Sequence, residues 1–365
     1  MVSLFLPPSV LPASVLPASS RLWSADRFPA MLGRVIRIGV NLVAGPPTPG
    51  PGSPAAASED GPAVADGRAG RRAGNLVDEI VATATVVADA GLPTGWLPQG
   101  LGYDAIGVLT ALARDVPGLE LGTSVVIVQP RHPRVLAAQA LTAQAAAHGR
   151  FTLGLGVSHP GLLEVYGQPF HRPLAALRAH LDTLLPILDG RAVPGASGAG
   201  SQAADSAVPG AAPRVPVLLG ALGPAMLRLA GQRTDGTITF LAGQRTIGDH
   251  VVPLIGAAAR EAGRPAPRVV VGLPVAVTTE PDRIRAELSA EYAGYARLPS
   301  YSAALARDGL AETEAGALAV VGDEETVAKG LAAYGDLGAT DALVSLVGTP
   351  EERTRTLRAL AALHA

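Results

Sequence analysis

Short apolar runs alternate with longer amphipathic runs from residue 35 to the end of the chain. The third apolar run, residues 119–128, is almost continuous, which is typical of a parallel strand buried on both faces. Alternation of this kind predicts parallel strands joined by helices. The strands that we expect cover residues 35–43, 96–97, 119–128, 151–157, 215–219, 237–241, 268–277 and 341–347.

The segments between these strands carry helix signals. In the first of them, Asn75 occupies an N-cap position, Asp78 and Glu79 lie in the first turn, and Gly91 follows the last turn. The expected helices cover residues 75–90, 103–114, 134–147, 174–188, 224–231, 246–262, 281–296, 323–335 and 350–363. Eight strands with intervening helices predict an α/β fold, a single (β/α)8 TIM barrel. A doubly wound sheet is disfavoured because no Gly-x-Gly-x-x-Gly turn follows the first strand.

Three segments interrupt the alternation. Residues 1–33 repeat the run Ser-Val-Leu-Pro-Ala and are rich in proline, which predicts a disordered, low-complexity extension before a barrel spanning residues 34–365. Residues 44–74 and 190–213 are rich in Gly and Ala, and we expect both to be flexible insertions. The first insertion follows a strand and would leave the barrel at the C-terminal face, where active sites lie, so a lid is an alternative to simple disorder.

Composition and charge limit the partners. Apolar residues make up 48% of the chain and charged residues 16%, which fits a large buried core. A net charge of −2 offers no basic field for nucleic acid or an anionic membrane surface. The chain contains no cysteine, no signal-peptide pattern and no apolar run fit to span a bilayer, so we expect a cytoplasmic protein. Apolar helices near the barrel surface predict a homodimer.

The positions that directly follow the strands hold few acids and bases. They contain no Asp/Glu pair for glycoside hydrolysis, and the seven histidines lack the spacing of metal ligands. We therefore expect a bound organic cofactor to carry the chemistry on a small-molecule substrate. The best candidate for its phosphate is the strand–helix turn made of Gly220, Ala221, Leu222, Gly223 and Pro224. Glycine permits close backbone approach and the helix N-terminus attracts anions, although a packing role explains the turn equally well.

Two further side chains are candidates for contact with a substrate. His159 follows the strand at 151–157, where a side chain points into the barrel mouth and an imidazole could donate a proton. A purely structural histidine is an equal alternative. Tyr301 clusters in sequence with Tyr292 and Tyr295, and these rings could wall a substrate pocket or simply pack together.

Several segments, taken together, resemble the luciferase-like family of (β/α)8 oxidoreductases, and within it the branch that uses the deazaflavin coenzyme F420. The segments that carry the resemblance are residues 96–99, 121–125, 130–133, 149–159, 220–226 and 298–301. Each is short, and their order and spacing over the chain from about residue 34 onward make the set specific.

The resemblance implies roles for individual residues. Ser124 and Val125 match a non-prolyl cis peptide that makes a bulge behind the cofactor ring, and Gln99 matches a polar position that faces the ring. The backbone of Gly156, Val157 and Ser158 would line the cofactor. The turn from Gly220 to Pro224 would hold its phosphate.

The sequence departs from the family's sugar-phosphate-oxidising members at two positions. Gly100 stands where those members carry a catalytic histidine, and His159 stands where they carry a glutamate. Sugar oxidation is therefore not expected. We expect an F420-dependent reductase that transfers hydride between the deazaflavin and a small organic substrate. The alternatives are an FMN-dependent luciferase-like monooxygenase, which presents the same ring and phosphate, and a non-catalytic flavin- or deazaflavin-binding barrel.

Overall fold

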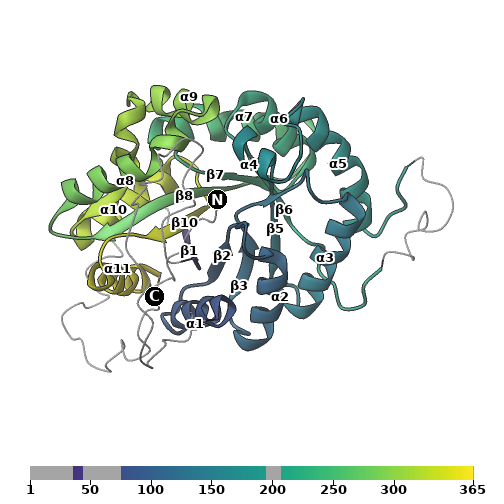
Figure 1. Cartoon of the computed structure of the whole chain (residues 1–365), viewed down its shortest axis with the longest axis horizontal. Helices are drawn as coiled ribbons and strands as arrows, with labels where there is room; N and C mark the ends of the chain where they lie inside the picture. The colour runs from purple at the N-terminus through teal and green to yellow at the C-terminus, as the bar shows by residue number, and fades with distance from the viewer. Residues whose placement is uncertain (1–35, 44–74, 195–206, 365) are drawn as a thin grey trace, which may run out of the picture.

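The computed structural model describes residues 36–43, 75–194 and 207–364 (Figure 1). The expectations for residues 1–33 and 44–74 lie outside these ranges, as do residues 195–206 of the insertion predicted at 190–213. Near the described end of that insertion, the carbonyl of Pro213 accepts a hydrogen bond of 2.6 Å from the side chain of Gln144.

Parallel strands close into a barrel, as the sequence predicts. Strand β1 (Arg37–Asn41) pairs with β2 (Thr94–Leu97) on one side and with β10 (Asp341–Leu346) on the other. The circle continues through β3 (Glu120–Thr123), β5 (Phe151–Gly156), β6 (Val217–Gly220), β7 (Gly236–Thr239) and β8 (Arg268–Val277). Pairing of β8 with β10 completes it. The fold is a (β/α)8 TIM barrel.

We expected one continuous third strand at residues 119–128, and its continuity is wrong. It is split into β3 and β4 (Val126–Ile127), and β4 pairs with β5. Ser124 and Val125 lie between the two pieces, outside the ladder. A further short strand, β9 (Val320–Gly322), pairs with the C-terminal end of β8 and was not predicted, because a three-residue strand carries no periodicity of its own.

Helices cover the outside of the barrel (Figure 1). They are α1 (Leu76–Asp89), α2 (Ala105–Asp115), α3 (Pro133–Ala146), α5 (Pro173–Leu188), α6 (Pro224–Arg233), α7 (Val252–Glu261), α10 (Glu324–Asp336) and α11 (Pro350–His364). Asn75 caps α1 by accepting a hydrogen bond from the N–H of Val77, which confirms its predicted role. The helix expected at 246–262 begins with a π-helical segment, η3 (Thr246–Val251), before α7.

Additional helices follow the C-terminal ends of two strands. Helix α4 (Pro160–Val165) follows β5, and an insert between β8 and α10 contains α8 (Pro281–Ala296), α9 (Pro299–Asp308) and the 3-10 segment η4 (Glu312–Leu318). Helix α8 agrees with the predicted span, whereas α4 and α9 were not predicted. The insert forms a second apolar core in which α8 packs against Leu241 and Ala276, at the ends of β7 and β8. The insert therefore lies at the C-terminal mouth of the barrel.

The centre of the barrel is filled by the indole of Trp96, which is only 1% exposed. It packs with Leu218, Ile238, Val270 and Leu343 from other strands. Glycine at positions 39 and 122 makes room for the ring, because a Cβ at either position would overlap it. The barrel is a packed core rather than a pore, so a ligand must bind at one of its ends.

Replacing the glycine beside the indole tests this packing. We expect Gly122→Ala to lower the free energy of unfolding by about 1–3 kcal/mol, because a methyl group added to a filled core forces its neighbours out of place. Urea unfolding monitored by circular dichroism measures the change. Gly118→Ala is the matched control, since nothing lies within 4 Å of a Cβ at that position. Equal midpoints for the two variants would refute the packed centre.

Candidate active site

The predicted cofactor-binding segments meet around the side chain of Val125. A Cβ built on Gly156 would lie 2.6 Å from Cγ2 of Val125, and one built on Gly220 would lie 3.6 Å from the same atom. Val125 also packs onto the cluster around Trp96 that fills the barrel. Three segments far apart in sequence therefore converge directly above the packed centre, at the C-terminal ends of their strands.

The backbone at Ser124 and Val125 forms a bulge tied to neighbouring strands. The peptide bond between them is cis, which confirms the expectation from the resemblance. The N–H of Ser124 donates to the carbonyl of Leu97 at 3.0 Å, and the carbonyl of Val125 accepts from the N–H of Gln99 at 3.3 Å. Both bulge residues are partly exposed at the mouth. The bulge can therefore present backbone to a ligand.

The turn from Gly220 to Pro224 joins β6 to α6 and leaves space for a ligand. Gly223 is the N-cap of α6, no side chain caps the helix, and nothing lies within 4 Å of a Cβ built on this glycine. The carbonyl of Leu222 is bound by Nε2 of His250 from η3, at 2.9 Å. A carbonyl can only accept, so His250 donates. This histidine keeps the Leu222 oxygen engaged in the protein, and the sequence offered no signal for it.

Gln99 makes its hydrogen bonds within its own loop and to a neighbouring arginine. Its Nε2 donates to the carbonyls of Gly100 and Tyr103, and its Oε1 accepts from the N–H of Ala105 and from Arg131 at 2.8 Å. All of its polar atoms are thus engaged by the start of α2 and by Arg131. A role facing a cofactor ring stays a prediction that these contacts do not support.

The backbone next to His159 is also shaped by local hydrogen bonds. The carbonyl of Val157 accepts a hydrogen bond of 2.8 Å from the side chain of Gln129. Ser158 has a left-handed backbone with φ of 58°. Val157 and Ser158 are partly exposed, whereas Gly156 is buried against Val125. That this segment lines a ligand stays a prediction.

His159 is the N-cap of α4. Its Nδ1 accepts a hydrogen bond of 3.3 Å from the N–H of Leu162, which assigns the ring proton to Nε2. The ring meets Tyr295 edge-on, with 5.9 Å between centroids. Burial lowers the pKa of His159, so the imidazole is neutral near pH 7 and its N–H is a hydrogen-bond donor rather than an acid. These contacts argue against the proton-donor role expected from sequence.

Aromatic rings gather beside His159. Phe240, which directly follows β7, meets Tyr292, Tyr295 and Tyr301 edge-on at 5.4, 6.0 and 6.0 Å between centroids. Burial raises the pKa of the Tyr301 hydroxyl, which therefore stays protonated. Tyr301 does pack with the other two tyrosines of the predicted cluster, and its contact with a substrate stays a prediction.

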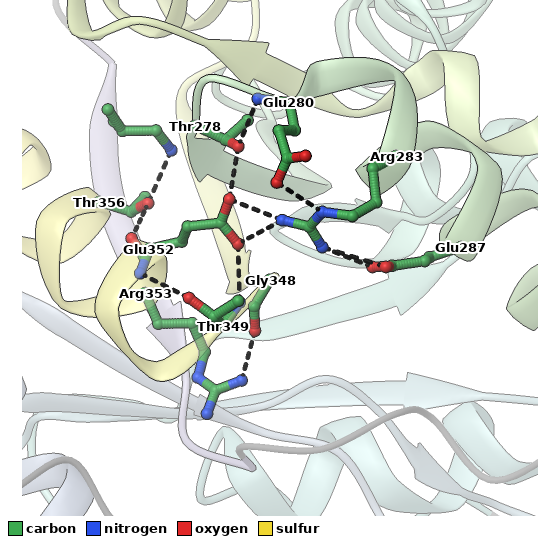
Figure 2. A network of polar contacts seen from close by, with 10 residues as sticks. Thr278, Glu280, Arg283, Glu287, Gly348, Thr349, Glu352, Arg353 and Thr356 are labelled. Carbon is green, nitrogen blue, oxygen red and sulfur yellow. Dashed lines mark hydrogen bonds and ion pairs between the residues drawn. The ribbon is translucent and has the colours of Figure 1, made fainter.

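A polar network holds the insert to the barrel at the opposite end of α8 (Figure 2). The carboxylate of Glu352, on α11, accepts hydrogen bonds from the Thr278 hydroxyl, the Thr349 N–H and the Arg283 guanidinium. Thr278 follows β8, Thr349 follows β10, and Arg283 lies in the first turn of α8. One carboxylate thus joins two strand ends to the helix that carries Tyr295.

Burial acts to raise the pKa of Glu352, but the hydrogen bonds from Thr278, Thr349 and Arg283 outweigh it, and the net pKa lies below the usual value for glutamate. When folding lowers the pKa of a carboxyl group, the group contributes its full stabilisation at pH values above its pKa in the unfolded state. That stabilisation is lost as the pH falls through the lowered pKa of the folded state.

Removing the charge of Glu352 tests the network. We expect Glu352→Gln to lower the free energy of unfolding at pH 7 by about 1–2 kcal/mol, since hydrogen bonds to a charged acceptor are weakened. The difference from the wild type should shrink as the pH falls through the lowered pKa of the folded state, because the wild-type carboxylate then becomes protonated. Unfolding midpoints across this pH range measure it. Glu325→Gln, which breaks the exposed pair with Lys329, should leave the midpoint unchanged.

Two features are absent from the part of the chain that the structure describes. Within residues 36–43, 75–194 and 207–364, no group of three His, Asp or Glu side chains is placed to hold a metal ion. Over the same residues, no helix is long and apolar enough to cross a membrane.

Comparisons with solved structures match this fold. The F420-dependent tetrahydromethanopterin reductase of Methanopyrus kandleri superposes with a TM-score of 0.64 at 21% identity, over 78% of this chain and 94% of that one. The FMN complex of the oxygenating constituent of 3,6-diketocamphane monooxygenase from Pseudomonas putida gives 0.62 at 16% identity, over 81% and 93%. At these identities the likeness shows the shared fold alone.

Sequence comparisons match part of the length of curated relatives. A putative coenzyme F420-dependent oxidoreductase of Mycobacterium tuberculosis is 32% identical over 188 residues, which span 47% of this chain and about half (52%) of that relative. A 5,10-methylenetetrahydromethanopterin reductase of Methanolobus tindarius is 27% identical over 267 residues, or 68% and 76% of the two chains. The model of the luciferase-like monooxygenase family matches residues 62–363, most of the sequence. The chain belongs to the luciferase-like monooxygenase family.

Proposed function

We propose that this protein is an F420-dependent oxidoreductase that works as a reductase on a small organic substrate. The observation that carries the proposal is the convergence of the bulge at Ser124 and Val125 with Gly156 and with Gly220, where the turn into α6 begins. The names of the M. tuberculosis and M. tindarius relatives, one an F420-dependent oxidoreductase and the other a reductase, support this reading.

The residues present fit a phosphorylated ring cofactor. The turn at Gly223 has room beside the backbone, the N-terminus of α6 favours an anion, and His250 keeps the Leu222 carbonyl engaged elsewhere. We assign the phosphate to the turn from Gly220 to Pro224. The ring would rest against Ser124 and Val125, with the backbone of Gly156, Val157 and Ser158 beside it. Reduced deazaflavin supplies a hydride, which carries two electrons, and releases one proton to solvent.

The chain's own contribution would be to orient a substrate and exclude water. Tyr295 and Tyr301 supply apolar ring surface next to the mouth, and neutral His159 offers Nε2–H as a donor to a substrate carbonyl. A neutral donor beside aromatic rings suits an uncharged substrate that holds an activated alkene or a carbonyl. This class agrees with the substrate expected from the sequence.

One specific observation favours a second candidate, an FMN-dependent monooxygenase. A solved structure with the same fold is an FMN complex of a monooxygenase, at a TM-score of 0.62. FMN also presents a ring and a phosphate, so it would use the same bulge and turn. A non-catalytic cofactor-binding barrel is the third reading, and a homodimer and a cytoplasmic location stay predictions from the sequence.

A direct titration separates the two cofactors. We expect purified protein to bind F420 at least about 10-fold more tightly than FMN, which corresponds to about 1.4 kcal/mol. Isothermal calorimetry with each cofactor, in the same buffer, measures both dissociation constants. Tight binding of FMN without binding of F420 would refute the F420 assignment and favour the monooxygenase.

A methyl group placed in the open turn tests the phosphate site. Gly223→Ala should weaken F420 binding at least about 10-fold, because the methyl group occupies space beside the turn where the phosphate would lie. Stability should change by less than about 1 kcal/mol, since the position is an N-cap with free space around it. Gly118→Ala, in the turn before β3, is the matched control and should bind F420 normally. Unchanged affinity in Gly223→Ala would place the phosphate elsewhere.

A further inference from the structure

Helix α8 extends across part of the barrel mouth. Near its start, Cδ1 of Ile284 lies 3.1 Å from a Cβ built on Gly348, in the loop after β10. Near its end, the ring of Tyr295 meets His159, in the loop after β5. Strands β5 and β10 lie on opposite sides of the barrel, with three strands between them in either direction. The side of α8 that carries Ile284 and Tyr295 therefore faces the mouth.

Glu291 lies on this same side of α8. Residues 284, 288, 291 and 295 are spaced at i, i+4, i+7 and i+11, which places them on one face of a helix. Ile284 and Leu288 are buried in the second apolar core, and Tyr295 packs against that core. Glu291 thus interrupts an apolar stripe with a carboxyl group, at a point between the two contacts that fix α8 over the mouth.

The carboxyl group of Glu291 has no polar partner among the described residues. The other acidic residues of α8 are paired, Asp282 with Arg285 at 2.9 Å and Glu287 with Arg283 at 3.0 Å. Glu291 forms no such ion pair or hydrogen bond with the part of the chain that the structure describes, although it is partly buried. A partly buried acid without a partner is costly for stability, which is typical of a functional site.

Burial raises the pKa of Glu291 to about 7, and no neighbouring charge contributes to the shift. The nearest ionisable groups on its own helix are Tyr292 and Tyr295, and His159 and Tyr301 contact Tyr295 from the loop after β5 and from α9. The segment η4, which packs against α8, carries Glu312 and Glu314. His159 is neutral near pH 7, and burial raises the pKa of the Tyr292 and Tyr301 hydroxyls. Among these described groups, Glu291 is the one whose carboxyl holds an exchangeable acidic proton near neutral pH.

We propose that Glu291 is the catalytic proton donor of the reduction, in place of His159. This inference rests on the proposed reductase function. The substrate takes up a hydride at one atom of its double bond, and the O–H bond of the Glu291 carboxyl breaks as its proton bonds to the other atom. The carboxylate then regains a proton from solvent, equal to the one released by the reduced cofactor. The substrate gains two electrons and two hydrogens, so the step balances.

The kinetic experiment uses full-length protein loaded with reduced F420 and the activated alkene 2-cyclohexenone as probe. We expect Glu291→Gln to bind reduced F420 like the wild type and to reduce the probe about 10²–10⁴-fold more slowly. Glu291→Asp should recover part of the rate. Glu261→Gln, an exposed glutamate on α7, is the matched control and should react at the wild-type rate. The wild-type rate should fall as the pH rises through about 7, and Glu291→Gln should lose this dependence.

An infrared titration of the cofactor-free protein gives a readout that does not depend on turnover. We expect the C=O band of one protonated carboxyl to disappear with a midpoint near pH 7, and to be missing in Glu291→Gln. His159→Ala should keep the alkaline fall in rate, which separates the two candidate donors. A carboxyl that titrates at the ordinary value for glutamate, or a full rate in loaded Glu291→Gln, would overturn the proposal.

Different results would contradict the proposed function and the role of Glu291. Failure of the proposed function shows as absence of F420 binding, or as no reduction of the probe by the loaded wild type, and the role of Glu291 falls with it. Failure of the Glu291 assignment alone shows as F420 binding with undiminished reduction in the Gln variant.

Discussion

The indole of Trp96 is the constraint on which the rest of the molecule depends. It occupies the barrel centre because positions 39 and 122 carry no side chain, and it leaves no space for a ligand between the strands. Val125 packs on top of this cluster and touches the glycines at 156 and 220. The floor of the candidate site is therefore the upper surface of the core, so the stability of the barrel and the shape of the site share the same contacts.

Charged side chains near the mouth are paired at two places among the described residues. Arg283 and Glu352 satisfy each other at the base of the insert, and Arg131 is engaged by Gln99 and Asp104 at the start of α2. Glu291 departs from this pairing. Burying a protonated carboxyl group costs less free energy than burying a charged carboxylate. Burial lowers the pKa of His159 and raises the pKa of Glu291, so it favours the neutral form of both groups.

The fold could be predicted from the sequence because its signals are local. Apolar runs such as residues 268–277 and caps such as Asn75 act within one element, and the structure places β8 and α1 where those signals predict them. The cis peptide followed only from the resemblance, since nothing in the residues Ser124 and Val125 themselves requires it. The short elements α4, β9 and α9 were missed because each depends on tertiary packing that a local pattern does not encode.

The sequence predicted which backbone segments come together at the candidate site, and much less about the contacts of its side chains. The segments follow from their position after strands, whereas side-chain roles depend on partners far apart in sequence. Gln99 and His159 make hydrogen bonds to the backbone around them. His250 binds the Leu222 carbonyl although it lies 28 residues away in sequence. Glu291 gave no signal, because its lack of a polar partner among the described residues is visible only once α8 is packed over the mouth.

The second apolar core has a consequence for motion. The side chains of α8, α9 and η4 form a cluster separate from the main barrel core, and the Glu352 network ties only one end of α8 to the strands. Clusters with their own contacts can open as units with a free energy below that of global unfolding. Opening of this insert would uncover the mouth while the barrel stays folded around Trp96. The rate at which a large cofactor enters and leaves would then be governed by the local stability of about forty residues, and not by that of the whole chain.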